Sequence, residues 1–547
     1  MEMEAVHHGQ KGSDTSEAIL APASDMTDTK SAENQQGIVY LHGARFWLIF
    51  AAIATLMFLI HFEIPVVTTS LVAITDELGG FDNAAWVVAA YLLGYVGVIV
   101  IFAKFSDIFG RKLFLMISAG LFVLFSAGCS AAQTMVQLIV CRAFQGMGGG
   151  GVYSLVTVII TEMVPQDGLT KMVSLISIFT SLGLLLGPIV GGAIAANTTW
   201  RWVFIINAPV GIMAIVIAFF ALPTGFPYHG QPNHHPKTFK HMTAKSTLDR
   251  IDIPGTILIL FAAVAITAGF EEADGQFAWR SAYVITLLTV GGLLWIALVI
   301  WERHVTLAAR VREPVLPWRF LVNRHMVSIL LHLLLLGGPI YVSYVLIPQR
   351  FQLVYGLSGL DAGVRLIPFT VMVPLGTIFA STLAGKLKIP ILYIFLAGAS
   401  LQVLGFALLG TLPTSLTIPS RIYGFQVIAG WGCGMNFSLL LVAVPFVVQK
   451  SDVAVGMGVS NQFRMMGGAI ILSIANSVFN THVRSELGSI SVISSESAIT
   501  SLPLDQQDHV KGVLAQAYNN QMIVLCICGA LQIPIALLMW KREKLVV

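Results

Sequence analysis

The chain has 547 residues, of which 56% are hydrophobic and 11% charged, and its mean hydropathy is +0.81. This composition excludes an ordinary soluble globular protein and indicates a chain built largely for lipid. With 31 Lys and Arg against 28 Asp and Glu, the net charge of +3 is too small to indicate a nucleic-acid partner. The five cysteines all lie in apolar stretches, which favours core packing over disulfides.

Residues 1–45 are polar and mixed in charge, so we expect a disordered cytosolic tail without a cleavable signal. From Phe46 onward, apolar runs long enough to cross a hydrocarbon core of about 30 Å recur almost to the C-terminus. These runs predict an all-α polytopic membrane protein with fourteen transmembrane helices: 46–72, 84–104, 112–131, 135–163, 170–195, 200–222, 251–270, 281–301, 325–348, 361–383, 389–410, 421–447, 454–480 and 520–540.

The distribution of Lys and Arg predicts the orientation of these spans. Placing the first 45 residues in the cytosol puts most of the positive charge on the cytosolic side, and an even number of spans returns the C-terminus there. Asn197 begins an Asn-Thr-Thr glycosylation sequon that then lies outside, although close to the membrane. We expect these segments: an N-terminal bundle of six helices (46–222), a cytosolic linker (223–250), two inserted helices (251–301), a cytosolic connection (302–324), a C-terminal bundle of six helices (325–540) with an extracellular loop (481–519), and a cytosolic tail (541–547).

Two charges fall well inside predicted spans. A charge at membrane depth is costly, so Glu63 and Arg142 are each a functional-site hypothesis, with a structural hydrogen bond to a neighbouring helix as the alternative. His61 lies two residues before Glu63, so on a helix the two side chains diverge by about 200° and cannot both face one cavity. A buried carboxylic acid can exchange a proton near neutral pH, which proton coupling requires. His332 fits a hydrogen-bonded core histidine better than a functional one.

The stretch AKFSDIFGRK, residues 103–112, concentrates charge between two apolar runs. It predicts a tight cytosolic turn at Gly110, followed by the cations Arg111 and Lys112. Asp107 can accept hydrogen bonds from Arg111 or from a helix N-terminus. We therefore interpret Asp107 and Arg111 as a breakable latch.

In the fifth span, Gly183, Gly187 and Gly191 recur every four residues and form one flat face that allows another backbone to approach closely. Pro188 removes a backbone donor beside that face and permits a bend, and Gly192 adds a second bare position. The alternative is ordinary packing of small residues.

Together these motifs resemble the major facilitator superfamily. AKFSDIFGRK is similar to its loop signature, with Ala103 in place of the usual first Gly, and RAFQGMGGGG (142–151) is similar to its fourth-helix motif. GLLLGPIVGG (183–192) is similar to the fifth-helix signature of antiporters, and WRWVFIINAPVG (200–211) resembles the fungal drug:proton antiporter branch with fourteen helices. In that branch an Asp usually stands where Glu63 aligns. The resemblance implies two parallel six-helix halves, a proton-coupling role for Glu63 with Arg142 as its partner, and a leak-proof, export-favouring contact at the glycine face.

From these observations we expect a proton-coupled efflux transporter that exports drugs, toxins or fungal secondary metabolites by alternating access. An importer of a siderophore or nutrient, or a non-transporting receptor in the same fold, stays open as an alternative. The sequence contains no GxxxxGK[ST] loop, metal-ligand cluster or nucleophile constellation, so we expect no enzyme activity, no ATP, no cofactor and no metal. The expected partners are a small organic substrate, protons and the lipid bilayer. We expect a monomer in the fungal plasma membrane, with a vacuolar or vesicular membrane also open. The candidate cavity residues are mostly uncharged: Gln145, Asn207, Tyr344, Trp431, Asn436, Asn461, Gln462 and Arg464.

Overall fold

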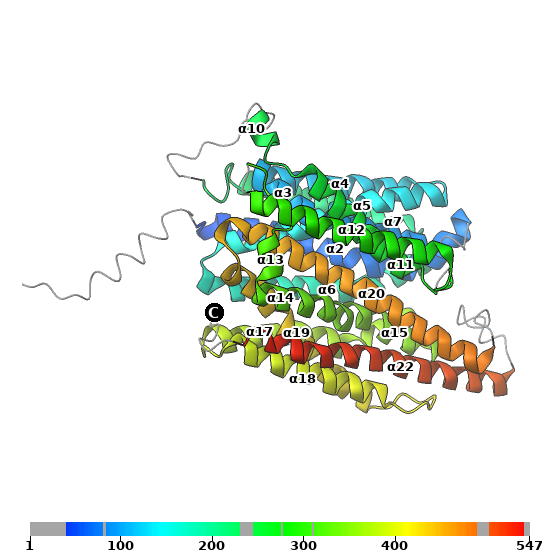
Figure 1. Ribbon diagram of the computed structural model, residues 1–547. Helices are drawn as coiled ribbons and strands as arrows, with labels where there is room; N and C mark the ends of the chain where they lie inside the picture. Colours follow the sequence, from blue (N-terminus) through cyan, green and yellow to red (C-terminus); the bar gives the residue numbers. More distant parts are fainter. Residues whose placement is uncertain are drawn as a thin grey trace, which may run out of the picture.

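The computed structural model describes residues 40–79, 84–229, 244–274, 277–308, 311–488 and 503–540, and these residues form helices and connecting segments without a β-sheet (Figure 1). The helices are α2 (Gly43–Leu78), α3 (Ala84–Phe109), α4 (Arg111–Ala131), α5 (Met135–Met163), α6 (Gln166–Asn197), α7 (Arg201–Ile205), α8 (Asn207–Ala221), α10 (Lys245–Leu248), α11 (Ile253–Glu272), α12 (Ala282–Ala308), α13 (Trp318–Val322), α14 (Arg324–Gly337), the π-helix η2 (Gly338–Val342), α15 (Ser343–Leu353), α16 (Gly359–Val364), α17 (Ile367–Gly385), α18 (Ile391–Gly410), α19 (Arg421–Val447), the 3-10 helix η3 (Lys450–Asp452), α20 (Val453–Leu487) and α22 (Leu504–Leu537).

Within the described residues, thirteen helices are both long and apolar enough to cross a membrane. The remaining predicted span, 454–480, lies within α20, a helix of 35 residues that contains several Gly, Ser and Asn residues together with Gln462 and Arg464. These residues lower the mean hydropathy of α20 below that of the other thirteen helices. The helix can carry them because most of its middle is buried against other helices and not against lipid. The all-α membrane fold predicted from the sequence is confirmed.

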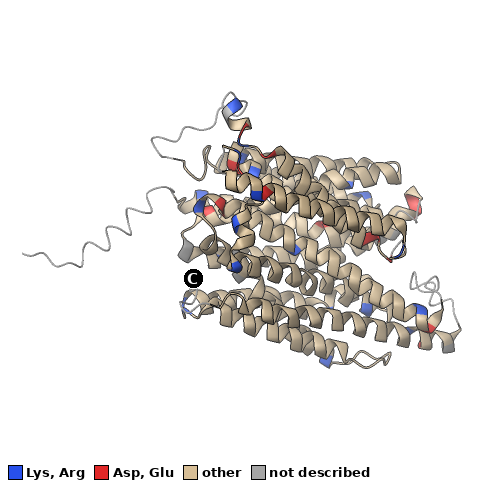
Figure 2. Ribbon diagram, in the orientation of Figure 1, with Lys and Arg blue, Asp and Glu red and all other residues tan. Residues whose placement is uncertain are grey.

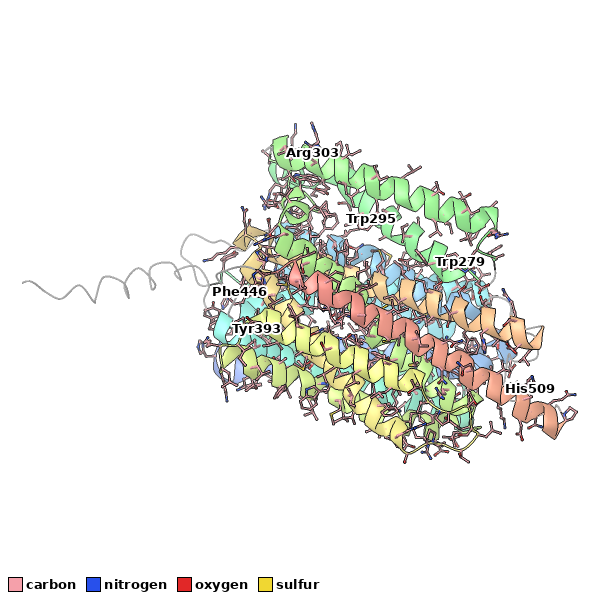
Figure 3. All side chains as sticks on the ribbon, turned by 60° about the horizontal axis from the view of Figure 1, so that its bottom comes forward. Trp279, Trp295, Arg303, Tyr393, Phe446 and His509 are labelled. Atoms are coloured by element: carbon pink, nitrogen blue, oxygen red, sulfur yellow. The ribbon has the colours of Figure 1, made fainter. Side chains whose placement is uncertain are left out.

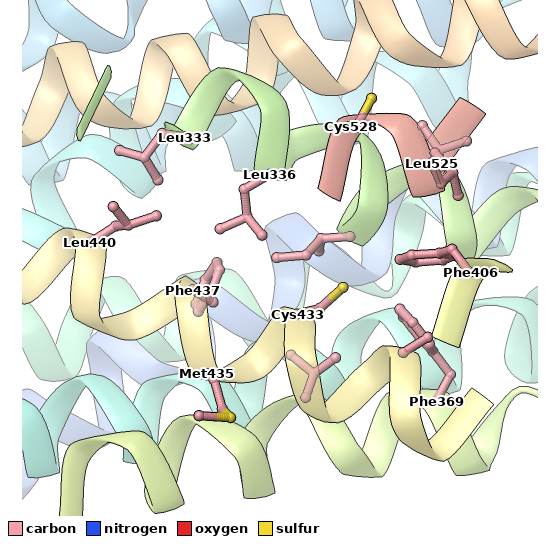
Figure 4. Close-up of a cluster of buried hydrophobic side chains, with 14 of the residues drawn as sticks. Leu333, Leu336, Phe369, Phe406, Cys433, Met435, Phe437, Leu440, Leu525 and Cys528 are labelled. Carbon is pink, nitrogen blue, oxygen red and sulfur yellow. The ribbon is translucent and has the colours of Figure 1, made fainter. Parts of the chain in front are cut away.

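The long helices form two bundles, one from α2 to α8 and one from α14 to α22. Each bundle has an apolar core, and Figure 4 shows part of the C-terminal one, to which α14, α17 and α19 contribute Leu336, Phe369 and Phe437. Between the bundles, α6 packs on α17 and α3 packs on α20. Thus α3, the second long helix of the N-terminal half, meets α20, the fifth of the C-terminal half. Likewise α6, the fifth of the N-terminal half, meets α17, the second of the C-terminal half.

Helices α11 and α12 lie beside this pair of bundles. They pack on each other, and α11 also contacts α3 and α20, so the inserted pair touches both halves. Two tryptophans of this region, Trp279 and Trp295, are labelled in Figure 3. On α20, Ser477 Oγ accepts from Trp279 Nε1 at 2.9 Å, and the ring centre of Phe463 lies 5.8 Å from that of Trp295. These contacts fix the inserted pair against α20.

Helix α2 begins and α22 ends at the same end of the molecule, at the left in Figure 1, which we call the proximal end. A dense group of charged residues lies at the proximal end of the N-terminal half, and the other charges lie mostly toward the opposite, distal end (Figure 2). The apolar middle between two charged ends is typical of a membrane-spanning bundle.

Several predicted boundaries differ from the structure. The expected loop 481–519 is helical up to Leu487 and again from Leu504, because polar helix ends continue beyond the apolar runs used to predict spans. The single span 200–222 is divided at Ile206 into α7 and α8, and 325–348 contains a π-turn. Residues 1–39, the middle of the expected linker (230–243), the middle of the 481–519 loop (489–502) and the tail 541–547 lie outside the described residues.

Candidate functional site

Glu63 and Arg142 form an ion pair inside the N-terminal half. Arg142 Nη1 lies 2.6 Å from Glu63 Oε1, and both side chains are fully buried. Asn207 donates to the other carboxylate oxygen from the first turn of α8. Arg142 also donates to the Val87 carbonyl at 2.9 Å and to Gln145 Oε1 at 2.8 Å. We call Glu63, Arg142, Gln145 and Asn207 the buried pair cluster.

Five helices position this cluster. Glu63 comes from α2, Arg142 and Gln145 from α5, Asn207 from α8, while α4 contributes Ser126 Oγ, which accepts from Gln145 Nε2 at 2.7 Å. The fifth, α3, supplies the Val87 carbonyl and a tyrosine ring that lies 4.3 Å from the Arg142 guanidinium carbon. The charges cancel within the cluster, which lowers the cost of burying either one.

His61 faces away from the buried pair cluster, as the helical spacing predicts. Its Nδ1 donates to the Met57 carbonyl at 2.9 Å, and its ring lies 5.6 Å from that of Tyr153 on α5. The carbonyl can only accept, so Nδ1 carries the hydrogen and the other ring nitrogen of a neutral imidazole is an acceptor. Helix α2 thus presents Glu63 and His61 to two different regions.

At the proximal end, the predicted contact between Asp107 and Arg111 is present as an ion pair. Arg111 also lies 2.6 Å from Glu162 Oε1 and donates to Ser106 Oγ at 2.7 Å. Gly110 precedes α4 with φ of +112°, a conformation that residues with a Cβ rarely adopt. We call Asp107, Arg111 and Glu162 the proximal latch.

Lys112 has a different role from that of its neighbour in the latch. Its Nζ donates to the Leu222 carbonyl at 2.8 Å and lies 4.7 Å from the centre of the Phe219 ring. It therefore ties the start of α4 to the end of α8 within the same half.

A second proximal ion pair connects α3 to the segment that precedes α13. Glu313 accepts from Lys104 at 2.6 Å and pairs with Arg250 at 2.6 Å. Burial acts to raise the pKa of Glu313, but the two cations outweigh it, so the pKa lies below its ordinary value. On the C-terminal side Arg319 pairs with Asp452. These groups and the proximal latch line a cavity of about 1030 Å³.

The glycine face of α6 packs against α2. A Cβ added at Gly183 would lie 2.6 Å from the Phe58 carbonyl oxygen, and one at Gly187 would lie 2.5 Å from Pro65 Cγ. Gly191 is equally crowded, with the Val66 carbonyl oxygen at 2.5 Å, whereas a Cβ at Gly192 would meet nothing within 4 Å. Gly192 is therefore not part of the close contact, and its inclusion in that set is wrong.

Pro188, between two of these glycines, is directed elsewhere. It is buried and lies near Gly363 of α16, where a Cβ added to the glycine would be 3.7 Å from Pro188 Cβ. The fifth helix thus presents glycines to its own half and the proline to the other half. Asn197, at the C-terminal end of α6, is exposed and its Nδ2 donates to the Ala193 carbonyl at 2.9 Å.

The eight candidate cavity residues do not form one group. Gln145 and Asn207 belong to the buried pair cluster. Asn436 belongs to a buried amide network in the C-terminal half, where it lies 3.1 Å from His332 Nε2 and 3.2 Å from Gln532 Oε1. These three side chains make their hydrogen bonds within one half, and their place in a shared central cavity stays a prediction.

The other candidates lie nearer the interface or in aromatic packing. Asn461 Nδ2 donates across the halves to Thr157 Oγ1 at 3.0 Å. The ring centre of Tyr344 lies 5.5 Å from that of Phe369, and the ring centre of Trp431 lies 5.4 Å from that of Phe379. Gln462 and Arg464 are buried, and neither side chain makes a hydrogen bond to a residue that the structure describes.

Comparison with known proteins identifies the family. The sequence profile of the Major Facilitator Superfamily matches residues 51–472. The MFS-type transporter FPY5 of Fusarium mangiferae is 37% identical over 512 residues, which cover 92% of this chain and 85% of that protein. The efflux pump FUS6 of Gibberella fujikuroi is 30% identical over 464 residues, covering 85% of this chain and 80% of that one.

Solved structures agree in fold. The structure of a bacterial homologue of the human lysosomal transporter Spinster, in an inward-facing and unoccupied conformation, matches with a TM-score of 0.57 at 14% identity. The match covers 92% of this chain and 100% of that one, and at this identity it concerns the fold alone. The chain is thus an integral membrane transporter, not an enzyme, and belongs to the Major Facilitator Superfamily.

Proposed function

We propose that this transporter is a proton-coupled antiporter that exports amphipathic organic molecules by alternating access between its two halves. The observation that carries the proposal is the fully buried pair of Glu63 and Arg142. A carboxylate at membrane depth is costly to retain and is the kind of group that a proton can convert between two states.

Protonation of Glu63 changes the bonding of the whole buried pair cluster. The ionised carboxylate accepts from Arg142 and Asn207, whereas the acid has a hydrogen to donate and no charge to offer the guanidinium. Arg142 keeps its bonds to Val87 and Gln145, so its positive charge stays beside Glu63 and favours later release of the proton.

The contacts of α2 give this change a route to the other half. Helix α2 carries Glu63 and packs on the glycine face of α6, and α6 in turn packs on α17. Interfaces with close backbone contact shift as units and do not deform gradually. A small rotation of α2 on protonation is therefore transmitted to the interface between the halves.

At the proximal end Glu313 pairs with Lys104 of the N-terminal half, whereas the proximal latch lies within that half and Arg319 pairs with Asp452 on the C-terminal side. Ser174 and Ser381 lie 3.0 Å apart between α6 and α17, and Asn461 bonds to Thr157 between α20 and α5. These contacts are polar and few, so they can break when the halves rock apart. Loading of cargo from the proximal side requires them to open.

The direction of transport rests on three supports. The positive-inside rule favours a cytosolic proximal end, with both termini in the cytosol and Asn197 outside. The glycine face resembles that of antiporters, and a relative of this chain is named an efflux pump.

We place the transporter in the plasma membrane and expect it to act as a monomer.

The experiment is uptake of fluorescent amphipathic probes, cationic, neutral and anionic, into inside-out vesicles with an imposed inside-acidic pH gradient. We expect accumulation that a protonophore abolishes and that Glu63→Gln loses, because the amide cannot titrate. Glu77→Gln is the matched control: the same substitution on the same helix, at a carboxylate that is 46% exposed. Gradient-driven uptake by Glu63→Gln at the wild-type rate would remove Glu63 from the mechanism.

A further inference from the structure

Arg464 lies on α20, in the region where the two halves meet. Its side chain is fully buried, and three aromatic rings surround it. The guanidinium carbon lies 5.2 Å from the ring centre of Tyr153 on α5, 5.6 Å from that of Tyr341 on η2 and 4.6 Å from that of Phe437 on α19. One of these rings belongs to the N-terminal half and two to the C-terminal half.

None of the three guanidinium nitrogens of Arg464 has a hydrogen-bond or ion-pair partner among the residues that the structure describes. Aromatic rings attract a cation but do not accept its N–H groups as an oxygen does. Arg142, by contrast, is equally buried and bonds to a carboxylate, an amide and a backbone carbonyl. Arg464 is thus a buried cation without an anion among the described residues, an arrangement that is unfavourable until an anionic partner binds.

The local backbone is shaped around this side chain. Helices α14 and α20 approach so closely that a Cβ added at Gly337 would lie 2.6 Å from the backbone nitrogen of Gly468, one turn after Arg464. Directly after Gly337 the chain makes a π-turn, which widens the helix and carries the Tyr341 ring toward Arg464. Such π-turns are uncommon and occur frequently at functional sites.

Polar groups of the N-terminal half face the same region without partners. The hydroxyls of Tyr153 and Tyr95 are buried and unbonded, and the two rings lie 6.0 Å apart. His61 Nε2 is likewise unbonded, and its ring lies 5.6 Å from that of Tyr153. Hydroxyl donors of the N-terminal half therefore lie close to a cation of the C-terminal half, between the two bundles.

From this arrangement we infer that Arg464 binds the acidic group of the cargo, and that the cargo is an organic anion with a flat aromatic or conjugated body. A carboxylate can accept two parallel N–H bonds from a guanidinium, and the tyrosine hydroxyls supply further donors. The surrounding rings suit an apolar, planar body beside the acid. This inference deepens the proposed export function by naming its substrate class, and it rests on that function.

The first test is binding to the purified full-length chain in lipid nanodiscs. The probes are 1-pyrenebutyrate and 1-naphthylacetate, each compared with its neutral primary amide, and the readout is the ligand-dependent rise in melting temperature at constant ionic strength. We expect the acids to bind roughly 10- to 100-fold more tightly than the amides, the range for a hydrogen bond to a charged group. Equal stabilisation by acid and amide, or none by either acid, overturns the inference.

Variants assign the preference to Arg464. Arg464→Gln should abolish the difference between acid and amide, and Arg464→Lys should retain part of it because a charge remains without the bidentate geometry. Arg484→Gln, at the exposed end of the same helix, is the matched control and should keep the wild-type preference. An acid preference that persists in a folded Arg464→Gln protein overturns the inference, and the wild-type comparison decides the question even if that variant does not fold.

A transport arm separates this inference from the proposed function. In inside-out vesicles with an inside-acidic gradient, export of acids in preference to amides supports both. Gradient-driven export that ignores the acid group refutes the inference and leaves the function standing. Selective binding of acids without any gradient-driven movement refutes the function and leaves the binding site standing.

Discussion

The buried pair cluster predicts a large, non-additive cost for neutralising one partner. In Glu63→Gln the guanidinium of Arg142 keeps its bonds to Val87 and Gln145 but loses the anion at 2.6 Å. An uncompensated charge in a fully buried position typically costs about 3–5 kcal/mol, and Arg142→Gln should cost a similar amount because it leaves the carboxylate alone. Replacing both partners removes both charges together, so the double variant should be destabilised by less than the sum.

The expected coupling energy is about 1–3 kcal/mol, the upper part of the range for residues in direct contact. The assay is unfolding of the purified wild-type protein, the two single variants and the double variant in one detergent or nanodisc, followed by intrinsic fluorescence. Additive effects within about 0.5 kcal/mol would refute the reasoning, because they would mean that the two charges stabilise the fold independently. The Glu77→Gln control should change stability only slightly, since that carboxylate is nearly half exposed.

Three further predictions concern the glycine face and the proximal end. Gly187→Leu should lower the melting temperature and abolish transport, because its Cβ alone would lie 2.5 Å from a proline side chain. Gly192→Ala should behave as the wild type, since a Cβ there meets nothing within 4 Å. Equal effects of the two variants on melting and uptake would contradict this prediction. Asp107→Asn should insert normally and turn over at least several-fold more slowly, so full turnover of a well-expressed variant would show that Arg111 needs only Glu162. The pKa of Glu313 is lowered from 4.5, so its ion pairs should stabilise the chain at neutral pH and be lost only as the pH falls below that value. The melting difference between the wild type and Glu313→Gln should therefore be constant near neutrality and shrink in acid, and a loss between pH values of about 6 and 8 would contradict the sign of this shift.

The sequence was sufficient for the fold because hydrophobic length and charge distribution are local properties. The spans, their order and the two halves follow from them, and Gly110 and the α6 glycines could be interpreted from spacing alone. The ends of the helices could not be predicted in the same way, because the polar ends of α20 and α22 carry no apolar signal. Their extent depends on helical propensity and on packing of the two ends against each other, which hydropathy does not measure.

The site was predictable in part for a related reason. Glu63, Arg142, Asp107 and Arg111 were identified because a charge in an apolar run, or within a short motif, is visible in one dimension. The pairing of Glu63 with Arg142 and of Asp107 with Arg111 was expected, but their further partners were not. Glu162 lies 51 residues from Arg111, and the break at Ile206 that places Asn207 beside Glu63 has no clear sequence signal. No pattern in the chain states that such residues meet.

Arg464 is the clearest example of this limit. The sequence places an arginine in a polar helix, and that is compatible with a salt bridge, a lipid-facing position or a cargo site. Only the packing of α5, α19 and η2 around it shows that it is fully buried and faces rings where a partner would be expected. Absence of a partner is a property of the whole fold.

The measurement that tests the central claim most directly is proton movement driven by cargo. Inside-out vesicles bearing the transporter are loaded with an acidic lumen and a pH-sensitive dye, and an accumulated probe from the uptake panel is then added outside. The account predicts rapid alkalinisation of the lumen with the wild type and with Glu77→Gln, and none with Glu63→Gln. Entry of the probe without any change of luminal pH would contradict proton antiport.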